Sequence, residues 1–149
     1  MSGENRELVS RIYDALRNDK MLASYVKRFS KGDTGAARKL FPFVSVGNVR
    51  YDVEPVTTAH DLYKYTVEVF GGVRSLVPGA AFDGGGVPGI RGILHLCDDI
   101  AIALRGATLG GFLSRPMEIL NMGYEPGPDK SGFTAYGAVV FVMEIMRLR

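Results

Sequence analysis

The sequence predicts an α+β fold in which a mixed, mainly antiparallel and twisted sheet is packed by two or three helices. Three observations lead to this prediction. Apolar residues recur at helical spacing near the N-terminus and in the middle of the chain, strand-like segments lie on either side of the central helix, and the chain ends in one unusually long strand. The expected order is two helices, three strands, one helix and two strands, with a long extended loop at 71–88.

Size and composition indicate a single globular domain, 1–149. The chain has 149 residues, of which 46% are hydrophobic and 23% are charged, which allows a substantial core. No apolar run approaches the roughly 20 residues that a membrane-spanning helix needs, so we expect no membrane partner. Cys97 is the single cysteine, which excludes an internal disulfide and a cysteine-based zinc site and favours assembly in a reducing cytoplasm.

Two helices are expected first. Leu8, Ile12 and Leu16 recur at spacings of four, so 7–17 is predicted to be an amphipathic helix. Asp19 can cap a second, shorter helix that runs from 20 to about 29. A polar loop, 30–39, follows.

Three strand segments, 40–47, 48–55 and 62–70, are expected next. Segment 40–47 has strand character and can continue past a bend to residue 55, and Pro42 places its start at an edge or an entry point. Segment 62–70 alternates between apolar and polar residues, which predicts one buried face and one face in water. The expected buried residues are Tyr63, Tyr65, Val67 and Val69.

The 71–88 segment is rich in glycine and proline, which argues against regular structure. It also carries Val73, Leu76 and Phe82, which are too apolar for a simple linker. Loops of this length are usually functional or disordered. We therefore expect 71–88 to dock onto a neighbouring molecule.

A central helix is predicted at 90–105, where Gly106 ends it, and a strand at 117–124. Cys97 lies on the apolar stripe of this helix and is expected to be a core residue. The last strand, 133–149, is apolar on both faces, so both faces should be covered, one of them in part by a partner subunit. Arg147 and Arg149 are expected to mark its solvent or interface end.

Candidate catalytic residues are few. The glycines of 84–89 lack the Gly-Lys-Ser/Thr ending of a phosphate-binding loop. His95 with Asp98 or Asp99 supplies two metal ligands on one helix, but no third ligand is identifiable. We therefore expect no enzymatic activity, no metal and no cofactor. The alternative is a small ligand-binding or enzymatic α+β domain that uses His60, His95 and Asp99.

Charge is distributed unevenly. Residues 1–50 carry a net charge of +5 and residues 51–149 a net charge of −3, which suits head-to-tail stacking of subunits or reflects ordinary scatter. One basic cluster is either a solvated surface or faces phosphate, which keeps a nucleic-acid-binding accessory as a third hypothesis. Its members are Lys27, Arg28, Lys31, Arg38 and Lys39.

The element order and strand character resemble a known family. They comprise the N-terminal helix pair, the Phe-Pro-Phe strand at 41–47, the strand at 63–70, the helix at 90–105 and the closing hairpin of 117–124 and 133–148. Together these are similar to the tail terminator and tail completion (neck) proteins of long-tailed bacteriophages, over nearly the whole chain. The 71–88 segment departs from the family because it is longer and more apolar than the expected link.

This resemblance implies a structural virion protein that forms a hexameric ring, caps the tail tube and joins the tail to the head. The implied partners are further copies of itself, the tail tube protein, a neck or head-completion protein, and DNA that passes through the lumen without sequence-specific binding. It implies assembly in the host cytoplasm and residence in the virion. Subunit contacts are expected at Arg74, Leu76, Phe82, Phe141, Met143 and Ile145, and the basic cluster is expected to face the tube or the DNA.

Overall fold

The computed structural model describes residues 2–32, 40–77, 79–86, 91–126 and 133–148. Its helices are α1 (Ser2–Arg17), α2 (Lys20–Tyr25), α3 (Ala80–Asp83) and α4 (Ile93–Leu104), with a short 3-10 turn, η2 (Gly84–Gly86). Its strands are β1 (Arg28–Lys31), β2 (Phe43–Pro55), β3 (His60–Arg74), β4 (Glu118–Pro126) and β5 (Thr134–Leu148). Within the described residues, no helix is both long enough and apolar enough to cross a membrane.

The five strands form one sheet in the order β1-β2-β3-β5-β4. All neighbours pair antiparallel except β1 and β2, which pair parallel. The sheet is therefore mixed and mainly antiparallel, and the predicted α+β class is confirmed. β5 lies between β3 and β4, so the strand with the longest apolar run has two neighbours over most of its length.

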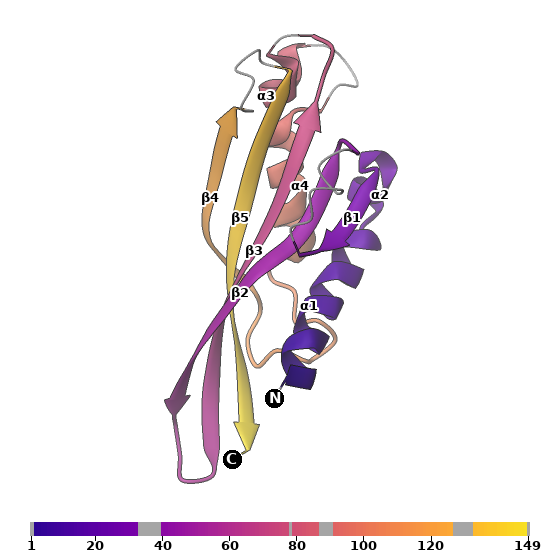
Figure 1. The fold of residues 1–149 in the computed structure, drawn as a ribbon. Coiled ribbons are helices and arrows are strands. Elements are labelled where there is room, and N and C mark those ends of the chain that lie inside the picture. The colour runs from indigo at the N-terminus through magenta and orange to yellow at the C-terminus, as the bar shows by residue number, and fades with distance from the viewer. Residues whose placement is uncertain (1, 33–39, 78, 87–90, 127–132, 149) are drawn as a thin grey trace.

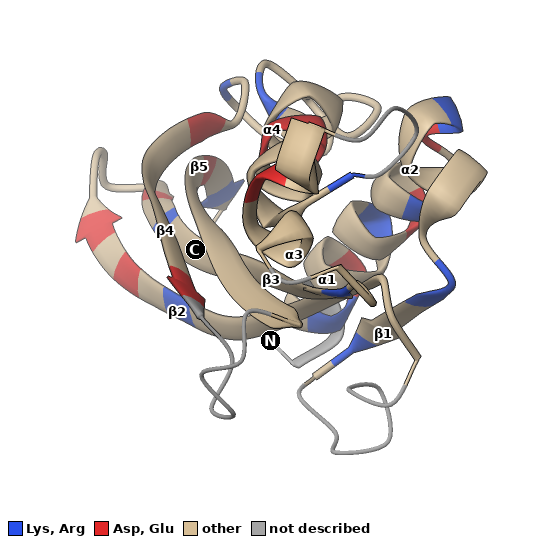
Figure 2. Cartoon of the chain, turned by 90° about the horizontal axis from the view of Figure 1, so that it is seen from above, with Lys and Arg blue, Asp and Glu red and all other residues tan. Residues whose placement is uncertain are grey.

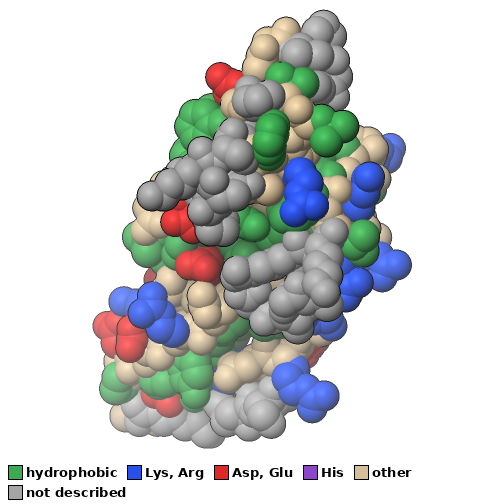
Figure 3. Space-filling model, turned by 45° about the horizontal axis from the view of Figure 1, so that its top comes forward, with side chains coloured by type: hydrophobic (Ala, Val, Ile, Leu, Met, Phe, Trp, Pro, Cys, Tyr) green, Lys and Arg blue, Asp and Glu red, His purple; other side chains and the backbone are tan. Residues whose placement is uncertain are grey.

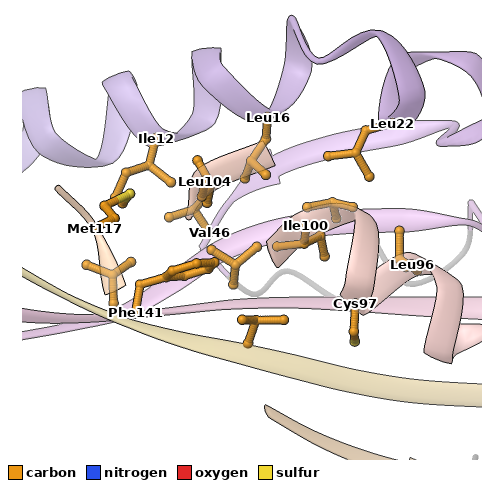
Figure 4. Packing of buried hydrophobic residues seen from close by; sticks show 14 of the residues in the cluster. Ile12, Leu16, Leu22, Val46, Leu96, Cys97, Ile100, Leu104, Met117 and Phe141 are labelled. Atoms are coloured by element: carbon orange, nitrogen blue, oxygen red, sulfur yellow. The ribbon is translucent and has the colours of Figure 1, made fainter. Parts of the chain in front are cut away.

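The helices α1, α2 and α4 lie on one face of the sheet (Figures 1 and 2). Every second residue of the central strands points into this layer, as Val46 and Phe141 do in Figure 4, and meets the apolar stripes of α1 and α4. Two glycines let α4 approach closely. A Cβ on Gly71 would lie 2.8 Å from Leu96, and a Cβ on Gly137 would lie 2.7 Å from the Cys97 sulfur. The sheet thus builds its core on one side.

Two predicted boundaries are wrong near the N-terminus. The second helix ends at Tyr25 instead of continuing to Phe29, and Arg28–Lys31 form the short strand β1. The reason is a long-range pairing, because β1 hydrogen-bonds in parallel register with the start of β2, from Phe43 to Val46. Helical spacing cannot reveal a strand whose partner lies far along the chain.

The expected long extended loop at 71–88 is also wrong for its described residues. Its first four residues complete β3, and residues 80–86 form α3 and η2. Ala80 and Ala81 are buried, and the backbone at Phe82 comes so close to Gly92 that a Cβ there would lie 2.5 Å from the Phe82 carbonyl carbon. The segment is therefore folded against the start of α4. Residues 78 and 87–88 lie outside the described part.

One part of the sheet extends beyond the helices. The second half of β2, the first half of β3 and the end of β5 project together as a three-stranded extension, which we call the arm (Figure 1). A bulge between Gly47 and Val49, with Asn48 at a φ of 48°, marks where β2 enters it. Residues 50–55 are exposed on both faces of β2.

Candidate assembly surface

The face of the sheet opposite the helices carries no layer of described structure. On β5 this open face consists of Tyr136, Ala138, Val140 and Val142, all partly exposed, followed by Glu144, Met146 and Leu148. The alternate residues of the same strand are buried under the helices. The open face is apolar along its centre and available to a partner.

Aromatic rings close the upper part of this open face. Phe43 is fully buried there, with its ring centroid 5.5 Å from that of Phe41, and 6.3 Å from those of both Phe70 and Tyr136. Gly72 makes room for this cluster, since a Cβ on it would lie 2.5 Å from the Phe43 ring. The Arg74 guanidinium lies 4.7 Å from the centre of the Phe41 ring. The chain thus covers this end of the open face with its own side chains.

The helix-side face of the arm carries a group of tyrosines. The rings of Tyr51 and Tyr63 stack at 5.7 Å, and Tyr65 lies 5.3 Å from Tyr51. The Arg147 guanidinium lies 4.0 Å from the centre of the Tyr63 ring and donates a 2.6 Å hydrogen bond to the Tyr65 hydroxyl. The Tyr65 hydroxyl in turn donates to Asn5 of α1 at 2.6 Å. These contacts attach the base of the arm to the first helix.

Both lateral edges of the sheet are available for strand pairing. No described strand pairs with the outer edge of β4, and β1 covers only residues 43–46 of β2. Exposed strand edges are templates for pairing with another chain. The described part of the sheet therefore has a partly unpaired edge on each side and one uncovered face.

The polar residues of the enzymatic alternative do not converge. His60 lies in the turn at the far end of the arm, where its Nδ1 is 3.2 Å from the Thr57 hydroxyl (Figure 1 shows the position of β3). His95 accepts a hydrogen bond from the Gly92 amide at 2.9 Å and so closes the start of α4. Within the described residues, no group of three or more His, Cys, Asp or Glu side chains is placed to hold a metal ion.

Asp99 is hydrogen-bonded to two side chains of the helical layer. It accepts a 2.8 Å hydrogen bond from Arg91 Nη2 and a 2.5 Å hydrogen bond from the Tyr25 hydroxyl, and its side chain is almost fully buried. Burial, together with this carboxylate, raises the pKa of Tyr25 well above its ordinary value. The triad joins α2 to α4 across the helical layer. Asp99 therefore acts in packing, and the enzymatic alternative gains no site.

Cys97 is confirmed as a core residue. It is fully buried on the face of α4 that meets Gly137. Burial, with a contribution from Asp98, raises the pKa of its thiol to about 12. The thiolate is therefore scarce at neutral pH, and no reactive role follows from its position.

Comparison with known proteins gives a fold relationship. No family model matches the chain, and no curated protein matches its sequence. Among solved structures, the chain is similar to one chain of the virion of the native gene transfer agent particle, with a TM-score of 0.61. The match covers 94% of this chain and 95% of that chain, at 16% sequence identity. The two chains share a fold over nearly the whole of both chains.

The residues predicted for subunit contact fall into two groups. Arg74, Leu76 and Phe82 are exposed, and Leu76 is 95% exposed. Phe141, Met143 and Ile145 are buried in the core of the same chain, because the helical layer covers their face of β5. The strand residues available to a neighbour are instead those of the open face, which alternate with them.

The charged residues singled out by the sequence also lie in different environments. Lys27, Arg28 and Lys31 are exposed, and the Lys31 ammonium lies 5.0 Å from the centre of the Tyr13 ring. Arg38, Lys39 and Arg149 lie outside the described residues. Arg147 is not at a solvent end as expected, since it is buried between Tyr63 and Tyr65. Glu144 pairs with Arg115 of its own chain at 3.6 Å.

Proposed function

We propose that this chain is a structural protein of a phage-like virion, which forms a closed ring that caps the tail tube and joins the tail to the head. The ring is a homo-oligomer, expected to be a hexamer. Its neighbours along the particle axis are the tail tube protein and a neck or head-completion protein. DNA passes through its lumen without sequence-specific contacts. The chain has no catalytic role in this proposal.

One observation carries the proposal. The fold matches a chain of a gene transfer agent virion along nearly the whole length of both chains, so the likeness is not limited to a common substructure. The elements that carry the sequence resemblance to tail terminators occur in the structure in the same relative order, with β1, α3 and η2 in addition. Fold alone does not fix function, so the surface must support the same role.

The surface of the subunit supports assembly. Both sheet edges offer unpaired backbone groups over part of their length, and the centre of the open face is apolar. The arm projects away from the helical body and can reach a component above or below the ring (Figure 1). The end of β3, with Arg74, and the helix α3, with Phe82, lie at the opposite end from the arm tip, where a second axial component can dock (Figure 1).

Immunogold electron microscopy tests the proposal directly. Antibodies against the purified chain are applied to intact tailed particles from the producing culture, and to particles treated to separate heads from tails. We expect label at a single position, the junction between tail and head. Label along the tube or at the tail tip would correct the position within the virion. Particles that carry no label, and contain no chain by mass spectrometry, would refute a virion role.

A further inference from the structure

Side chains of opposite charge gather on opposite edges of the sheet. The stretch from α2 to β1, residues 20–31, contains four basic residues and no acidic one, and all four are exposed. We call Lys20, Lys27, Arg28 and Lys31 the basic edge. The elements α4 and β4 contain four acidic residues and no Lys or Arg. Asp99 is held by Arg91, and the other three, Asp98, Glu118 and Glu125, are exposed and form the acidic edge.

The two edges lie on opposite sides of the subunit. β1 and β4 are the outermost strands, with three strands between them. In Figure 3 lysine and arginine side chains gather mainly on the right, the side of α2 and β1, and acidic side chains lie to the left, the side of β4. The uneven charge of the sequence thus becomes a lateral polarity of the folded chain.

Exposed apolar side chains accompany both edges. Beside the acidic edge lie Phe82, Ile102, Leu120 and Tyr124, and Ile102 is 77% exposed. The Phe82 and Tyr124 rings meet edge to face at 6.4 Å, so α3 and β4 form one patch. Beside the basic edge lie Met21 and Leu40, both about half exposed. Apolar residues within a polar rim are the usual composition of a protein interface.

The charges of both edges are free for use outside the subunit. Among the described residues, none of the acidic-edge carboxylates forms an ion pair, and the same holds for Lys20, Lys27 and Arg28. The ion pairs that do form involve α1, the arm, the α4 network and the loop before β4. A partner with the opposite charge can therefore approach either edge without displacing an existing pair.

We propose that the acidic edge of one copy of this chain contacts the basic edge of a second copy. The contact uses a different surface on each copy, so it repeats head to tail and closes into a ring when the rotation per subunit permits. The ring geometry rests on the function proposed above, whereas the contact itself rests on the charges and apolar residues of the two edges.

A second copy explains more of the surface than other occupants do. DNA or a negatively charged tube surface would satisfy the basic edge, but would leave the acidic edge and its apolar patch exposed. A second copy satisfies both edges and covers both apolar groups in one contact. It also places the three carboxylates of the acidic edge opposite the four cations of the basic edge at every contact of the ring.

Charge reversal tests the contact. One variant carries Asp98→Lys, Glu118→Lys and Glu125→Lys, and a second carries Lys20→Glu, Lys27→Glu and Arg28→Glu. We expect the wild-type chain to associate in sedimentation velocity, less so at high salt, and each variant alone to associate at least about tenfold more weakly. A 1:1 mixture of the two variants should associate again, because each reversed edge then meets its complement in an alternating assembly.

The matched control reverses two exposed charges on α1, Arg6→Glu with Asp14→Lys, and should leave association unchanged. Circular dichroism confirms that each variant is folded. The contact is refuted by a wild-type chain that stays monomeric at its highest soluble concentration, by variants that associate like wild type, or by folded variants whose mixture fails to associate. Loss of DNA binding in the second variant with unchanged self-association would assign the basic edge to nucleic acid.

The outcomes separate this contact from the virion role. If the chain is found in particles but charge reversal does not change its self-association, the virion role is supported and the proposed contact is refuted. If the chain is absent from particles but association returns when the two variants are mixed, the contact is supported and the virion role is refuted.

Discussion

The two faces of β5 have similar hydrophobicity and different environments. On one face, Val139, Phe141 and Met143 are almost fully buried beneath α1 and α4. On the other face, Ala138, Val140 and Val142 lie one residue away and stay partly exposed. Burial is therefore decided by the layer of helices, and the apolar pattern on the second face is available for assembly. A strand that is apolar on both sides is thus buried on only one side within this subunit.

The largest expected effect comes from emptying the covered face. Phe141→Ala removes a fully buried ring from the centre of the core and should lower the free energy of unfolding by about 3–5 kcal/mol. Urea denaturation followed by circular dichroism measures this loss. Val142→Ala, on the open face, is the matched control and should cost well under half as much. Equal losses would show that the two faces are covered alike.

Two glycine substitutions test how closely α4 packs against the covered face of β5. Gly137→Ala places a methyl group 2.7 Å from the Cys97 sulfur and 3.0 Å from Ile93, which forces α4 away from β5. We expect a loss of about 1–3 kcal/mol in the free energy of unfolding. In Gly123→Ala, on β4, the new Cβ meets nothing within 4 Å, so no such loss should occur. Similar midpoints of thermal unfolding for the two variants would contradict the close packing of α4.

A pH titration tests the hydrogen-bonded group of Tyr25, Arg91 and Asp99, which joins α2 to α4. Because folding raises the pKa of Tyr25 above its ordinary value of 10.0, the unfolded chain loses this proton first as pH rises. The stability that Tyr25 contributes is complete below about pH 10 and declines above it. Tyr25→Phe should therefore be less stable than wild type by about 1 kcal/mol at pH 8. This difference should shrink toward pH 11, and parallel stability curves for the two chains would argue against it.

The smallest effect on stability is expected on the open face. Val140→Lys places an ammonium group on the partly exposed side of β5, where water can solvate it, so the free energy of unfolding should change by less than about 1 kcal/mol. The measurement is again denaturant unfolding of the isolated chain. A chain that no longer folds would mean that the open face is part of the subunit core.

Local patterns predicted the elements whose determinants are local. The α4 stripe, the alternation along β3 and the closing hairpin follow from residue spacing, and all three are present with small shifts of their bounds. β1 escaped prediction because four residues become a strand only through pairing with β2. The helix α3 was not predicted because glycines surround it in the sequence. That pattern gives no sign that its two alanines are buried against the core.

The candidate surface was harder to predict because it depends on contacts between segments that lie far apart in the sequence. Spacing showed that both faces of β5 are apolar, but only the position of the helices tells which face is covered. Arg147 is a clear example, since its terminal position and charge suggest solvent exposure, whereas Tyr63 and Tyr65 enclose it from a strand about eighty residues earlier. The sequence contained one signal of the lateral polarity, the opposite net charges of its two parts, because the basic edge belongs to the first part and the acidic edge to the second.

The arm has a consequence for the distribution of local opening along a single strand. Residues 135–142 of β5 pair with β3 on one side and with β4 on the other, beneath α4. Residues 143–148 pair with β3, and on their other side the described backbone bonds are those of Glu144 and Met146 with Ser114 of the loop before β4. Amide hydrogen exchange should therefore be slowest near Val139 and should quicken steadily toward Leu148. Local opening of β5 should therefore cost the most free energy beneath α4 and the least at the last residues of the arm.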